Sequence, residues 1–577
     1  MLHPRPAPRF PALALGLSVL LTASAEAQVE IGPADDVEAA IGQLAPGGEL
    51  VLRGGTYTLT GRFTFSVMGT EAAPILIRAK AGERPHLHRP LDDQNIIDLD
   101  VAEYVTIQGI EFSGGSAGLR ITRARALTIQ ECEIHDTGDV AVRANDSGTY
   151  DSLRILRNHI HHTNGTGEGM YLGCNNNACR VANSLIEGNY VHDTNGPSVS
   201  QGDGIELKEG GYNNVIRDNV IHDTNYPCIL TYSAVGNGAP NIIERNVMWG
   251  CGDHGIQSAA DAIIRNNIIL GAAGDGIAMQ PHQAGTPSNL VVVHNTILNA
   301  TSDAISLRGV TGSVVIANNA AFAQQATAIN VVSGNLSGVV VAGNVGQGGV
   351  AGVNGGFVAG SIAQDFVAAS YSGTTPNDVF PAAGGGLLGA GDSARVPLDD
   401  FNGSLRQGVA DVGAYAFTPA GNPGWILQPG FKDGTPVVPP PDAGVVDASQ
   451  VADASPPADG GLGDAASPGD AAAPGDGAAP RDAAAPGDAA AGSDAGRRGD
   501  AAGEADAGAG GSGGTLKAGC GCRTTPRPHD ARSAVAPWLM LCVLPLVLRR
   551  GRAAVTARRR EQPPKPRSRL TRASASR

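Results

Sequence analysis

An internal repeat constrains this chain more than any other feature of its sequence. Between positions 109 and 319, a short phrase with aliphatic residues on both sides of a pivot returns every 21 to 31 residues. Asparagine occupies most of the pivots, which are Gly109, Cys132, Asn158, Asn189, Asn219, Asn246, Asn267, Asn295 and Asn319. The aliphatic residues show no helical period, so each unit predicts two or three short β-strands.

A solenoid follows from a repeat of this length. One unit is too small to bury its own aliphatic side chains, so successive units must stack as coils. We therefore predict an all-β fold, a parallel β-helix, over residues 28–434. Asparagine at a fixed turn can form a ladder of hydrogen bonds along the axis, which explains its recurrence without catalysis. A leucine-rich repeat is the main alternative, but its Leu/Asn consensus is absent.

Both ends of such a solenoid must be covered, because an open coil exposes unpaired strand edges. Residues 33–42 offer a helix N-cap at Asp35 or Asp36, followed by apolar residues at helical spacing. We expect this helix to plug the first coil. We expect residues 411–417 to close the body at its other end.

Composition excludes several other classes. Glycine supplies 80 of 577 residues without a three-residue period, which excludes collagen and disfavours a helix bundle. Residues 28–434 carry a net charge of −18, which argues against a nucleic-acid partner and is compatible with a divalent cation. We expect a monomer.

The N-terminus and a long C-terminal segment predict export. Residues 1–27 contain two arginines, an apolar run and a small-residue site ending at Ala27, the pattern of a cleaved secretory signal peptide. Residues 435–515 consist mainly of Ala, Asp, Gly and Pro and carry a net charge of −10. This composition predicts a disordered acidic linker.

Residues 516–577 form a basic tail with a net charge of +13. It contains the motif GCGCR at 519–523, a short apolar stretch at 535–548 and a cluster of arginines. This order resembles the MYXO-CTERM sorting signal. The resemblance implies processing near Cys520 or Cys522 by a sorting protease and anchoring at the outer membrane, with the body at the cell surface. A plain C-terminal membrane anchor is the alternative.

Eight cysteines fit an oxidising compartment. Cys174 and Cys179 bracket four residues and could close a small loop. Cys228 and Cys251 are 23 residues apart, about one coil, so we expect them to be neighbours on adjacent coils. The body has no CxxC pair, which disfavours zinc binding through cysteine.

The longest repeats run from Asn158 to Asn219 and carry the largest loops, where function tends to concentrate on a rigid scaffold. Strand alternation there directs Ile205 and Leu207 inward and directs Glu206 and Lys208 outward. Alignment of the neighbouring coils gives an outward strip of side chains, namely Arg143, Glu168, Tyr171, Asp203, Glu206, Lys208, Tyr232 and Gln257.

This strip suits β-elimination on a uronic-acid polymer. A cation must neutralise the sugar carboxylate, a base must remove the acidified C5 proton, and an acid must assist the leaving oxygen. The expected roles are catalysis by Lys208, Tyr232 and Arg143, substrate contact by Tyr171, Gln257 and Glu168, and Ca²⁺ binding by Asp203 and Glu206. Lysine serves as the base only if burial or a nearby cation lowers its pKa. Tyr171 is a further candidate for the acid.

The body also resembles the right-handed parallel β-helix proteins of the pectate-lyase-like superfamily, through the asparagine coils, GGTY at 54–57 and DVGAY at 411–415. Residues 69–78 are similar to the chondroitinase B and alginate lyase group. That resemblance implies a base lysine five residues after a calcium-binding acid, as Lys208 follows Asp203. It also implies an arginine near Tyr232 and a glutamate at 201, where this chain has no arginine and has Gln201.

Other interpretations of these residues remain open. The protein could be a non-catalytic glycan-binding or adhesion β-helix, or an epimerase or hydrolase, since this fold hosts several functions. Lys208 and Glu206 could form a solvated ion pair, and Asp203 could be a turn residue.

A histidine series falls three residues after successive pivots: His135, His161, His192 and His222. We expect these side chains to stack along an outer strand, with metal binding as the alternative. The aspartates beside them, Asp136, Asp193 and Asp223, are expected to cap turns.

Overall fold

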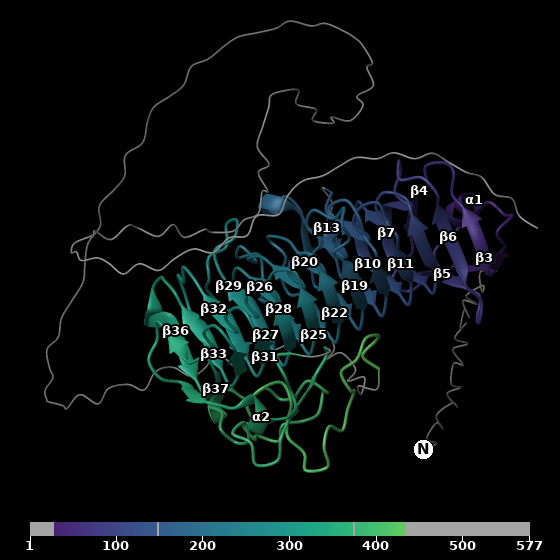
Figure 1. Cartoon of the computed structure of the whole chain (residues 1–577). Helices are drawn as coiled ribbons and strands as arrows, with labels where there is room; N and C mark the ends of the chain where they lie inside the picture. The colour runs from purple at the N-terminus through teal and green to yellow at the C-terminus, as the bar shows by residue number, and fades with distance from the viewer. Residues whose placement is uncertain (1–27, 147–148, 373–374, 434–577) are drawn as a thin grey trace, which may run out of the picture. The chain divides into compact units, whose positions relative to one another are not determined.

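The computed structural model describes residues 28–146, 149–372 and 375–433 (Figure 1). Within these ranges the chain coils into a parallel β-helix, which confirms the fold predicted from the repeat. The expected signal peptide at 1–27, the linker at 435–515 and the sorting tail at 516–577 lie outside the described residues. In the described part of the chain, no helix has the length and apolar character needed to cross a membrane.

Each central coil contributes one strand to each of three rows, and every row pairs in parallel. The first row contains β1 (Val29–Ile31), β2 (Glu49–Leu52), β5 (Ile75–Ala79), β7 (Ile97–Gln108), β10 (Ala124–Gln130), β14 (Arg154–Leu156), β18 (Leu185–Glu187), β21 (Val215–Arg217), β24 (Asn241–Glu244), β27 (Ala262–Arg265), β30 (Leu290–Val293), β33 (Val314–Ala317) and β36 (Val339–Ala342).

The second row is a separate 13-stranded sheet. It contains β3 (Gly55–Thr58), β6 (Pro85–Arg89), β8 (Glu111–Gly114), β11 (Glu133–His135), β15 (His159–His161), β19 (Tyr190–Thr194), β22 (Val220–Thr224), β25 (Val247–Cys251), β28 (Ile268–Ala272), β31 (Thr296–Asn299), β34 (Ala320–Ala323), β37 (Asn344–Gln347) and β39 (Phe357–Ala359).

The third row is joined to the first through the long strand β7. It contains β4 (Thr64–Met68), β9 (Leu119–Ile121), β12 (Val142–Ala144), β16 (Met170–Leu172), β20 (Ile205–Leu207), β23 (Ile229–Thr231), β26 (Ile256–Ser258), β29 (Ile277–Met279), β32 (Ile305–Leu307), β35 (Ile329–Val331) and β38 (Val350–Ala351). Two short strands, β13 (Thr149–Asp151) and β17 (Arg180–Ala182), pair between the third and first rows.

The interior is filled by aliphatic side chains that stack from coil to coil. In the first row Ile186, Ile216 and Ile243 occupy equivalent positions and are fully buried. In the third row Ile205 and Leu207 point into the same core, as the alternation predicts. Burial of this apolar surface is the main stabilising contribution to the solenoid.

The recurring asparagines form the predicted ladder. The Nδ2 of Asn158 donates to the Oδ1 of Asn189 at 3.0 Å, and Asn189 donates to Asn219 at 2.9 Å. The same Oδ1 atoms accept from the backbone N–H of the preceding asparagine, and the pattern continues as far as Asn344. All these side chains are buried, so the ladder satisfies polar groups that would otherwise be costly inside the core.

A short helix covers the first coil. Helix α1 (Val37–Gly42) begins at Asp36, whose side chain accepts a hydrogen bond from the Ala39 N–H at 3.0 Å. Val37 and Ile41 are buried in the solenoid core. The N-cap is therefore Asp36 rather than Asp35, which accepts instead from the backbone of Gly32.

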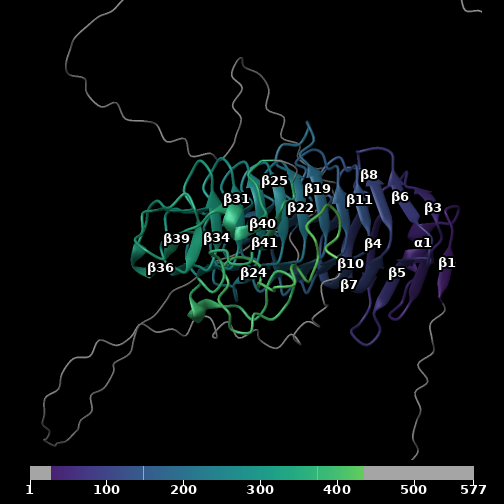
Figure 2. The same ribbon diagram turned by 60° about the horizontal axis from the view of Figure 1, so that its bottom comes forward.

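The chain after the last coil folds back along the solenoid, so residues 411–417 do not close its end as expected. This strap, residues 360–433, contains α2 (Ile362–Asp365) and the antiparallel pair β40 (Phe366–Ala368) and β41 (Asp378–Pro381). In Figure 2 its strands β40 and β41 lie over the second row near β31 and β34. Its apolar side chains, such as Phe380 and Tyr415, share a buried cluster with Trp249 and Leu298 of that row. The outward side chains of these second-row strands are apolar, a feature not identified from the sequence, and the strap folds back because it covers them.

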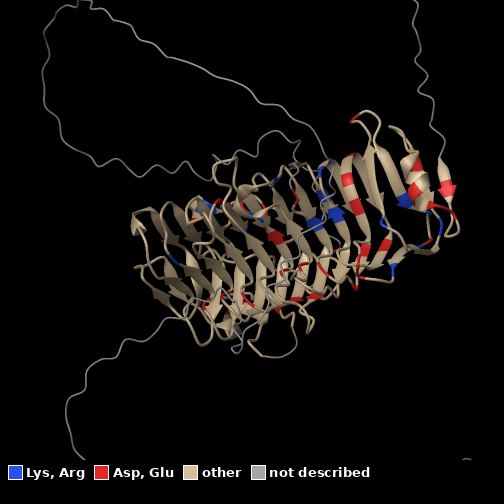
Figure 3. Cartoon of the chain, turned by 90° about the horizontal axis from the view of Figure 1, so that it is seen from above, with Lys and Arg blue, Asp and Glu red and all other residues tan. Residues whose placement is uncertain are grey.

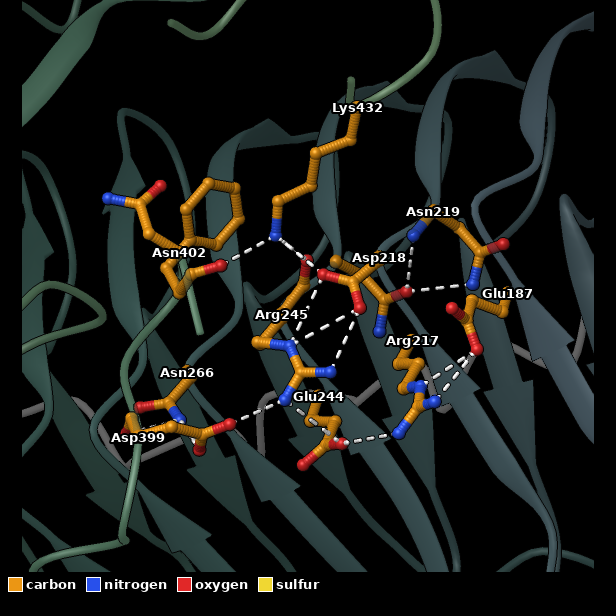
Figure 4. Close-up of polar contacts among 12 residues, drawn as sticks. Glu187, Arg217, Asp218, Asn219, Glu244, Arg245, Asn266, Asp399, Asn402 and Lys432 are labelled. Atoms are coloured by element: carbon orange, nitrogen blue, oxygen red, sulfur yellow. Dashed lines mark hydrogen bonds and ion pairs between the residues drawn. The ribbon is translucent and has the colours of Figure 1, made fainter. Parts of the chain in front are cut away.

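Buried charges fix the strap to the coils (Figure 4). Lys432 points down from the strap, and its Nζ donates to the Asp218 carboxylate at 2.7 Å and to the Phe401 carbonyl at 2.6 Å. Arg245 binds the same Asp218 at 2.9 Å and reaches Asp399 of the strap at 2.6 Å. Burial acts to raise the pKa of Asp218, but Lys432 and Arg245 outweigh it and hold that pKa below its usual value.

Both expected cysteine pairs are disulfide-bonded. Cys174 joins Cys179 and closes a small loop, and Cys228 joins Cys251 across adjacent coils. Cys132 is buried and free among the described cysteines, and burial raises the pKa of its thiol to about 12. The first bridge lies within one of the two longest repeats, and the second joins the two coils that follow them.

The histidine series stacks along the outer face of the second row, as expected. The rings of His135 and His161 lie 5.0 Å apart and those of His161 and His192 lie 5.1 Å apart, nearly parallel in both cases. Burial lowers the pKa of His159 to about 3 and that of His161 and His192 to about 4, with neighbouring histidines adding to the effect for His159 and His161. These imidazoles are therefore neutral at pH 7.

Charged side chains are unevenly spread along the axis. Figure 3 shows Lys, Arg, Asp and Glu gathered on the N-terminal and central coils, while the C-terminal coils are almost free of them. Within the described chain, the ionisable side chains that could bind a ligand or transfer a proton are thus concentrated on the N-terminal and central coils.

Candidate functional site

The third row aligns much of the predicted strip. Arg143 on β12 pairs in register with Tyr171 on β16, and Tyr171 pairs with Glu206 on β20. The row continues through Leu230 to Gln257 on β26. The alignment of Arg143 with Tyr171, made from sequence, is confirmed.

Lys208 and Tyr232 lie two residues further along the chain than the aligned positions of Glu206 and Leu230. They follow the ends of β20 and β23, whose last residues Leu207 and Thr231 pair directly. Tyr232 donates its backbone N–H to the Leu207 carbonyl at 3.2 Å. Lys208 and Tyr232 therefore occupy equivalent positions on adjacent coils.

Lys208, Glu206 and Tyr232 form a closed polar triangle. The Nζ of Lys208 donates to the Oε1 of Glu206 at 2.7 Å and lies 3.1 Å from the Tyr232 hydroxyl, which itself donates to Oε1 at 2.9 Å. Lys208 is 5%, Tyr232 3% and Glu206 1% exposed. The alternative of a solvated ion pair is therefore wrong, because the pair is buried.

Two aromatic rings face the ammonium group. The Nζ of Lys208 lies 4.7 Å from the centre of the Tyr171 ring and 4.6 Å from that of Tyr232. Such contacts stabilise a cation at a desolvated position. Tyr171, expected to contact substrate, thus also forms a wall of the lysine site.

The pKa of Lys208 is raised, although its expected role as a base requires a lowered value. Burial acts to lower this pKa, but the adjacent Glu206 carboxylate outweighs it, so Lys208 is an ammonium ion at neutral pH. Burial and Glu206 together raise the pKa of Tyr232 well above its usual value, so its phenol stays protonated. In this structure both groups hold their protons.

Three buried carboxylates meet beside the triangle. Oxygens of Glu168, Asp203 and Glu206 lie within 4.8 Å of one another. Each residue has one buried oxygen that lacks a hydrogen-bond partner among the described residues, namely Glu168 Oε1, Asp203 Oδ1 and Glu206 Oε2. Burial, then Glu206, raises the pKa of Asp203 well above its usual value.

This trio fits a hard divalent cation. Carboxylate oxygens are the preferred ligands of Ca²⁺, and unpaired buried oxygens are costly unless something neutralises them. Asp203 and Glu206 were the expected ligands. Glu168, expected to contact substrate, lies with them because it precedes β16 by two residues just as Asp203 precedes β20, and its substrate contact stays a prediction.

A histidine missed in the sequence completes the cluster. The Nε2 of His282 lies 3.1 Å from the Tyr232 hydroxyl, and the two rings are 4.7 Å apart. Its loop is held by Glu209, which accepts from the Ala284 N–H at 2.8 Å. The sequence could not predict this contact because His282 lies 50 residues from Tyr232, in a loop outside the repeat.

Two loops meet next to the triangle. Gln283, beside His282, donates to Asn175 at 3.0 Å, and Asn175 lies in the loop closed by the Cys174–Cys179 disulfide. The loop that carries His282 is therefore joined to the disulfide-closed loop beside the triangle.

Arg143 has other partners. Its Nε donates to Asn145 at 2.6 Å, and its guanidinium lies 3.8 Å from Asp139. Within the described chain, its ion pairs and hydrogen bonds do not include Lys208 or Tyr232. Its catalytic role stays a prediction, as does substrate contact by Gln257.

Comparison with known proteins agrees with the fold. A family model described as "Right handed beta helix region" matches residues 92–200 and 180–345. The solenoid is therefore a right-handed parallel β-helix. No curated protein matches the chain.

Several solved structures are similar at low identity. An alginate lyase from Paenibacillus sp. is 20% identical, with a TM-score of 0.34, over 57% of this chain and 97% of that chain. Pectate lyase Pel9A is 16% identical, with a TM-score of 0.42, over 68% and 96%. A mannuronan C-5 epimerase module from Azotobacter vinelandii is 11% identical, with a TM-score of 0.36, over 54% and 89%.

Proposed function

We propose that the protein is a polysaccharide lyase that cleaves a uronic-acid polymer by β-elimination. One observation carries the proposal: a buried lysine and a buried tyrosine lie 3.1 Å apart beside three converging carboxylates. Elimination needs two proton-transfer groups and a means of neutralising the sugar carboxylate, and this cluster offers both.

The proposed roles follow from protonation and position. Tyr232 holds its proton and can give it to the leaving oxygen, while His282 and Glu206 orient its hydroxyl. Lys208, once deprotonated, is the base for the C5 proton. Before that it is an ammonium that attracts the substrate carboxylate.

A Ca²⁺ ion is part of the proposal. Glu168, Asp203 and Glu206 would hold it, and when bound it would supply positive charge for the uronate carboxylate. A cation is needed at this position because three buried carboxylates would otherwise repel an anionic sugar.

Export and surface anchoring complete the proposal. The signal-peptide pattern at 1–27 and the sorting-type tail at 516–577 support secretion, processing by a sorting protease and retention at the outer membrane. We propose that the body acts there as a monomer on an acidic polysaccharide.

The direct test is product analysis. The purified full chain is incubated with a panel of uronans and Ca²⁺, and the ultraviolet absorbance of the unsaturated product is followed. Elimination creates that double bond and hydrolysis does not. Absorbance on any uronan supports the proposal, and reducing ends without absorbance would replace it with hydrolysis.

Glycan binding without catalysis is the second candidate, favoured by the raised pKa of Lys208. A permanent ammonium beside two tyrosine rings binds an anionic sugar but does not remove a proton. Retained uronan binding in calorimetry, with no unsaturated product at any pH from neutral to alkaline, would select this function.

The rate of elimination should rise steeply with pH. Because the pKa of Lys208 is raised, the deprotonated fraction at neutral pH is small and grows about tenfold for each pH unit below that pKa. We expect kcat/KM to follow this slope in the wild type. A flat profile above neutral pH would rule out Lys208 as the base.

Calcium should stabilise the chain through the carboxylate trio. At about 100 times its Kd, a ligand specific for the native state adds about 2.7 kcal/mol. We expect Ca²⁺ to raise the unfolding temperature of the wild type but not of Glu168→Gln or Asp203→Asn. The matched control is Glu187→Gln, a partly exposed glutamate on β18, which should respond as the wild type does. Equal responses in all four proteins would place the ion elsewhere.

A further inference from the structure

A second group of metal-ligand side chains lies on a different face of the solenoid. Glu133 on β11 and His159 and His161 on β15 bring three ligand atoms within 4.8 Å of one another. They belong to the second row, whereas Lys208 and the carboxylate trio belong to the third. This group is independent of the proposed lyase chemistry.

Strand geometry assembles the group. Glu133 and His159 are direct partners in the parallel pairing of β11 and β15. His161 lies two residues after His159 and so projects from the same outer face. One carboxylate and two imidazoles therefore converge without any contribution from a loop.

The distances are close to those of a transition-metal site. The Oε1 of Glu133 lies 3.4 Å from the Nδ1 of His159 and is hydrogen-bonded to the Nε2 of His161 at 3.0 Å. Metal–ligand bonds of about 2.0–2.2 Å at tetrahedral angles separate two ligand atoms by about 3.3–3.6 Å, so an ion would replace that hydrogen bond after a small outward shift of His161. The side chains are 21%, 13% and 29% exposed for Glu133, His161 and His159, so an ion can enter from solvent.

Hydrogen bonding leaves a lone pair of His159 facing the carboxylate. His192 donates its Nδ1–H to Asp193 at 2.7 Å, so the Nε2 of a neutral His192 is an acceptor. It lies 2.8 Å from the Nε2 of His159, which must therefore donate. The Nδ1 of His159 is then an acceptor that faces the Glu133 oxygen with no proton between them. A cation at that point satisfies both atoms.

The histidine ladder has a different hydrogen-bond partner at His161. His135, His192 and His222 each bind a following aspartate through Nδ1. His161 instead has His162 beside it, with the two Nδ1 atoms 2.6 Å apart. In the tautomer pair in which His161 donates through Nδ1 to the Nδ1 of His162, the Nε2 of His161 is free for a metal.

Arg84 does not fill the site. It contacts the other oxygen of Glu133, Oε2, and donates to Glu111 at 2.5 Å. Oε1 is left facing the imidazoles. The guanidinium therefore orients the carboxylate from behind, as outer partners do at metal sites.

We propose that Glu133, His159 and His161 form a binding site for a late first-row divalent ion such as Zn²⁺, with an open position toward solvent. Two imidazole nitrogens and one carboxylate oxygen favour such an ion over Ca²⁺. The ion would link the adjacent strands β11 and β15 on the outer face of the solenoid.

The test is zinc titration of the full chain, purified without a histidine tag and kept in excess Ca²⁺ to occupy the carboxylate trio. A competing zinc indicator gives affinity and stoichiometry. We expect saturable binding that weakens at least about tenfold in His159→Gln/His161→Gln and in the isosteric Glu133→Gln. With Co²⁺ as the probe, the wild type should show the visible bands of a low-symmetry site.

Two controls keep the result specific. His222→Gln alters the ladder away from the site, and His86→Gln alters the neighbouring group of His86, Glu111 and His135. Both should bind Zn²⁺ as the wild type does. Absence of binding in the wild type, unchanged binding in Glu133→Gln and the double variant, or loss only in His86→Gln would overturn the proposal. Circular dichroism confirms that each variant is folded.

Discussion

Alanine in place of Lys208 is expected to reduce elimination on the preferred uronan by about 100-fold or more, the usual contribution of a positioned base. The substitution removes the group that takes the C5 proton and also the ammonium that balances Glu206. The measurement is the initial rate of absorbance by the unsaturated product, at the pH where the wild type is fastest.

Lys208→Arg separates these two effects. Arginine keeps the positive charge beside Glu206 but stays protonated at every accessible pH, so it cannot act as a base. We expect Lys208→Arg to retain uronan binding and to lose the elimination rate. If Lys208→Arg eliminates at the wild-type rate, then the lysine serves only as a charge and the base lies elsewhere.

The largest loss of stability is expected for Arg245→Met. This arginine is buried and pairs with Asp218, Glu244 and Asp399. Its removal takes the only ion-pair partner of Asp399 among the described residues. It also leaves Asp218 with Lys432 alone and Glu244 with Arg217 and Arg265. Breaking a buried ion pair in this way costs about 3–5 kcal/mol. The free energy of unfolding, from denaturant titration, should fall by that order.

The matched control is Arg154→Met, an exposed arginine on β14, which should change stability by less than about 0.5 kcal/mol. The pH dependence gives a second check. The pKa values of Asp218 and Glu244 are lowered in the fold, so their stabilisation is complete at neutral pH. It is lost as pH falls below the unfolded values of about 3.9–4.3 and through the lower folded values. An Arg245→Met protein as stable as Arg154→Met would show that the network is not needed.

The solenoid could be predicted because its signal is local and repeated. Each asparagine ladder position and each inward isoleucine appears in the sequence at a nearly fixed interval, so one good alignment of coils gives the register. That same alignment correctly placed Arg143 beside Tyr171 and Cys228 beside Cys251. The stacked histidines follow for the same reason.

What lies in loops could not be predicted in this way. His282 reaches Tyr232 through a segment that has no equivalent in neighbouring coils. Glu168 does align with Asp203 one coil later, but the alignment does not show that both carboxylates meet Glu206 at one point. The direction of the Lys208 pKa shift could not be predicted either. It depends on whether burial, which lowers this pKa, or the Glu206 carboxylate 2.7 Å away, which raises it, has the larger effect. Sequence spacing does not contain that distance.

The strap changes how the solenoid would respond to tension. The described chain ends at Asp433, which pairs with Arg157 at 2.8 Å, many coils before the last strand β39. A pull applied beyond residue 433 therefore loads the Asp433–Arg157 pair and then Lys432 and its buried partners, and does not peel the final coil from its neighbour. The coils therefore stay wound until the strap itself detaches.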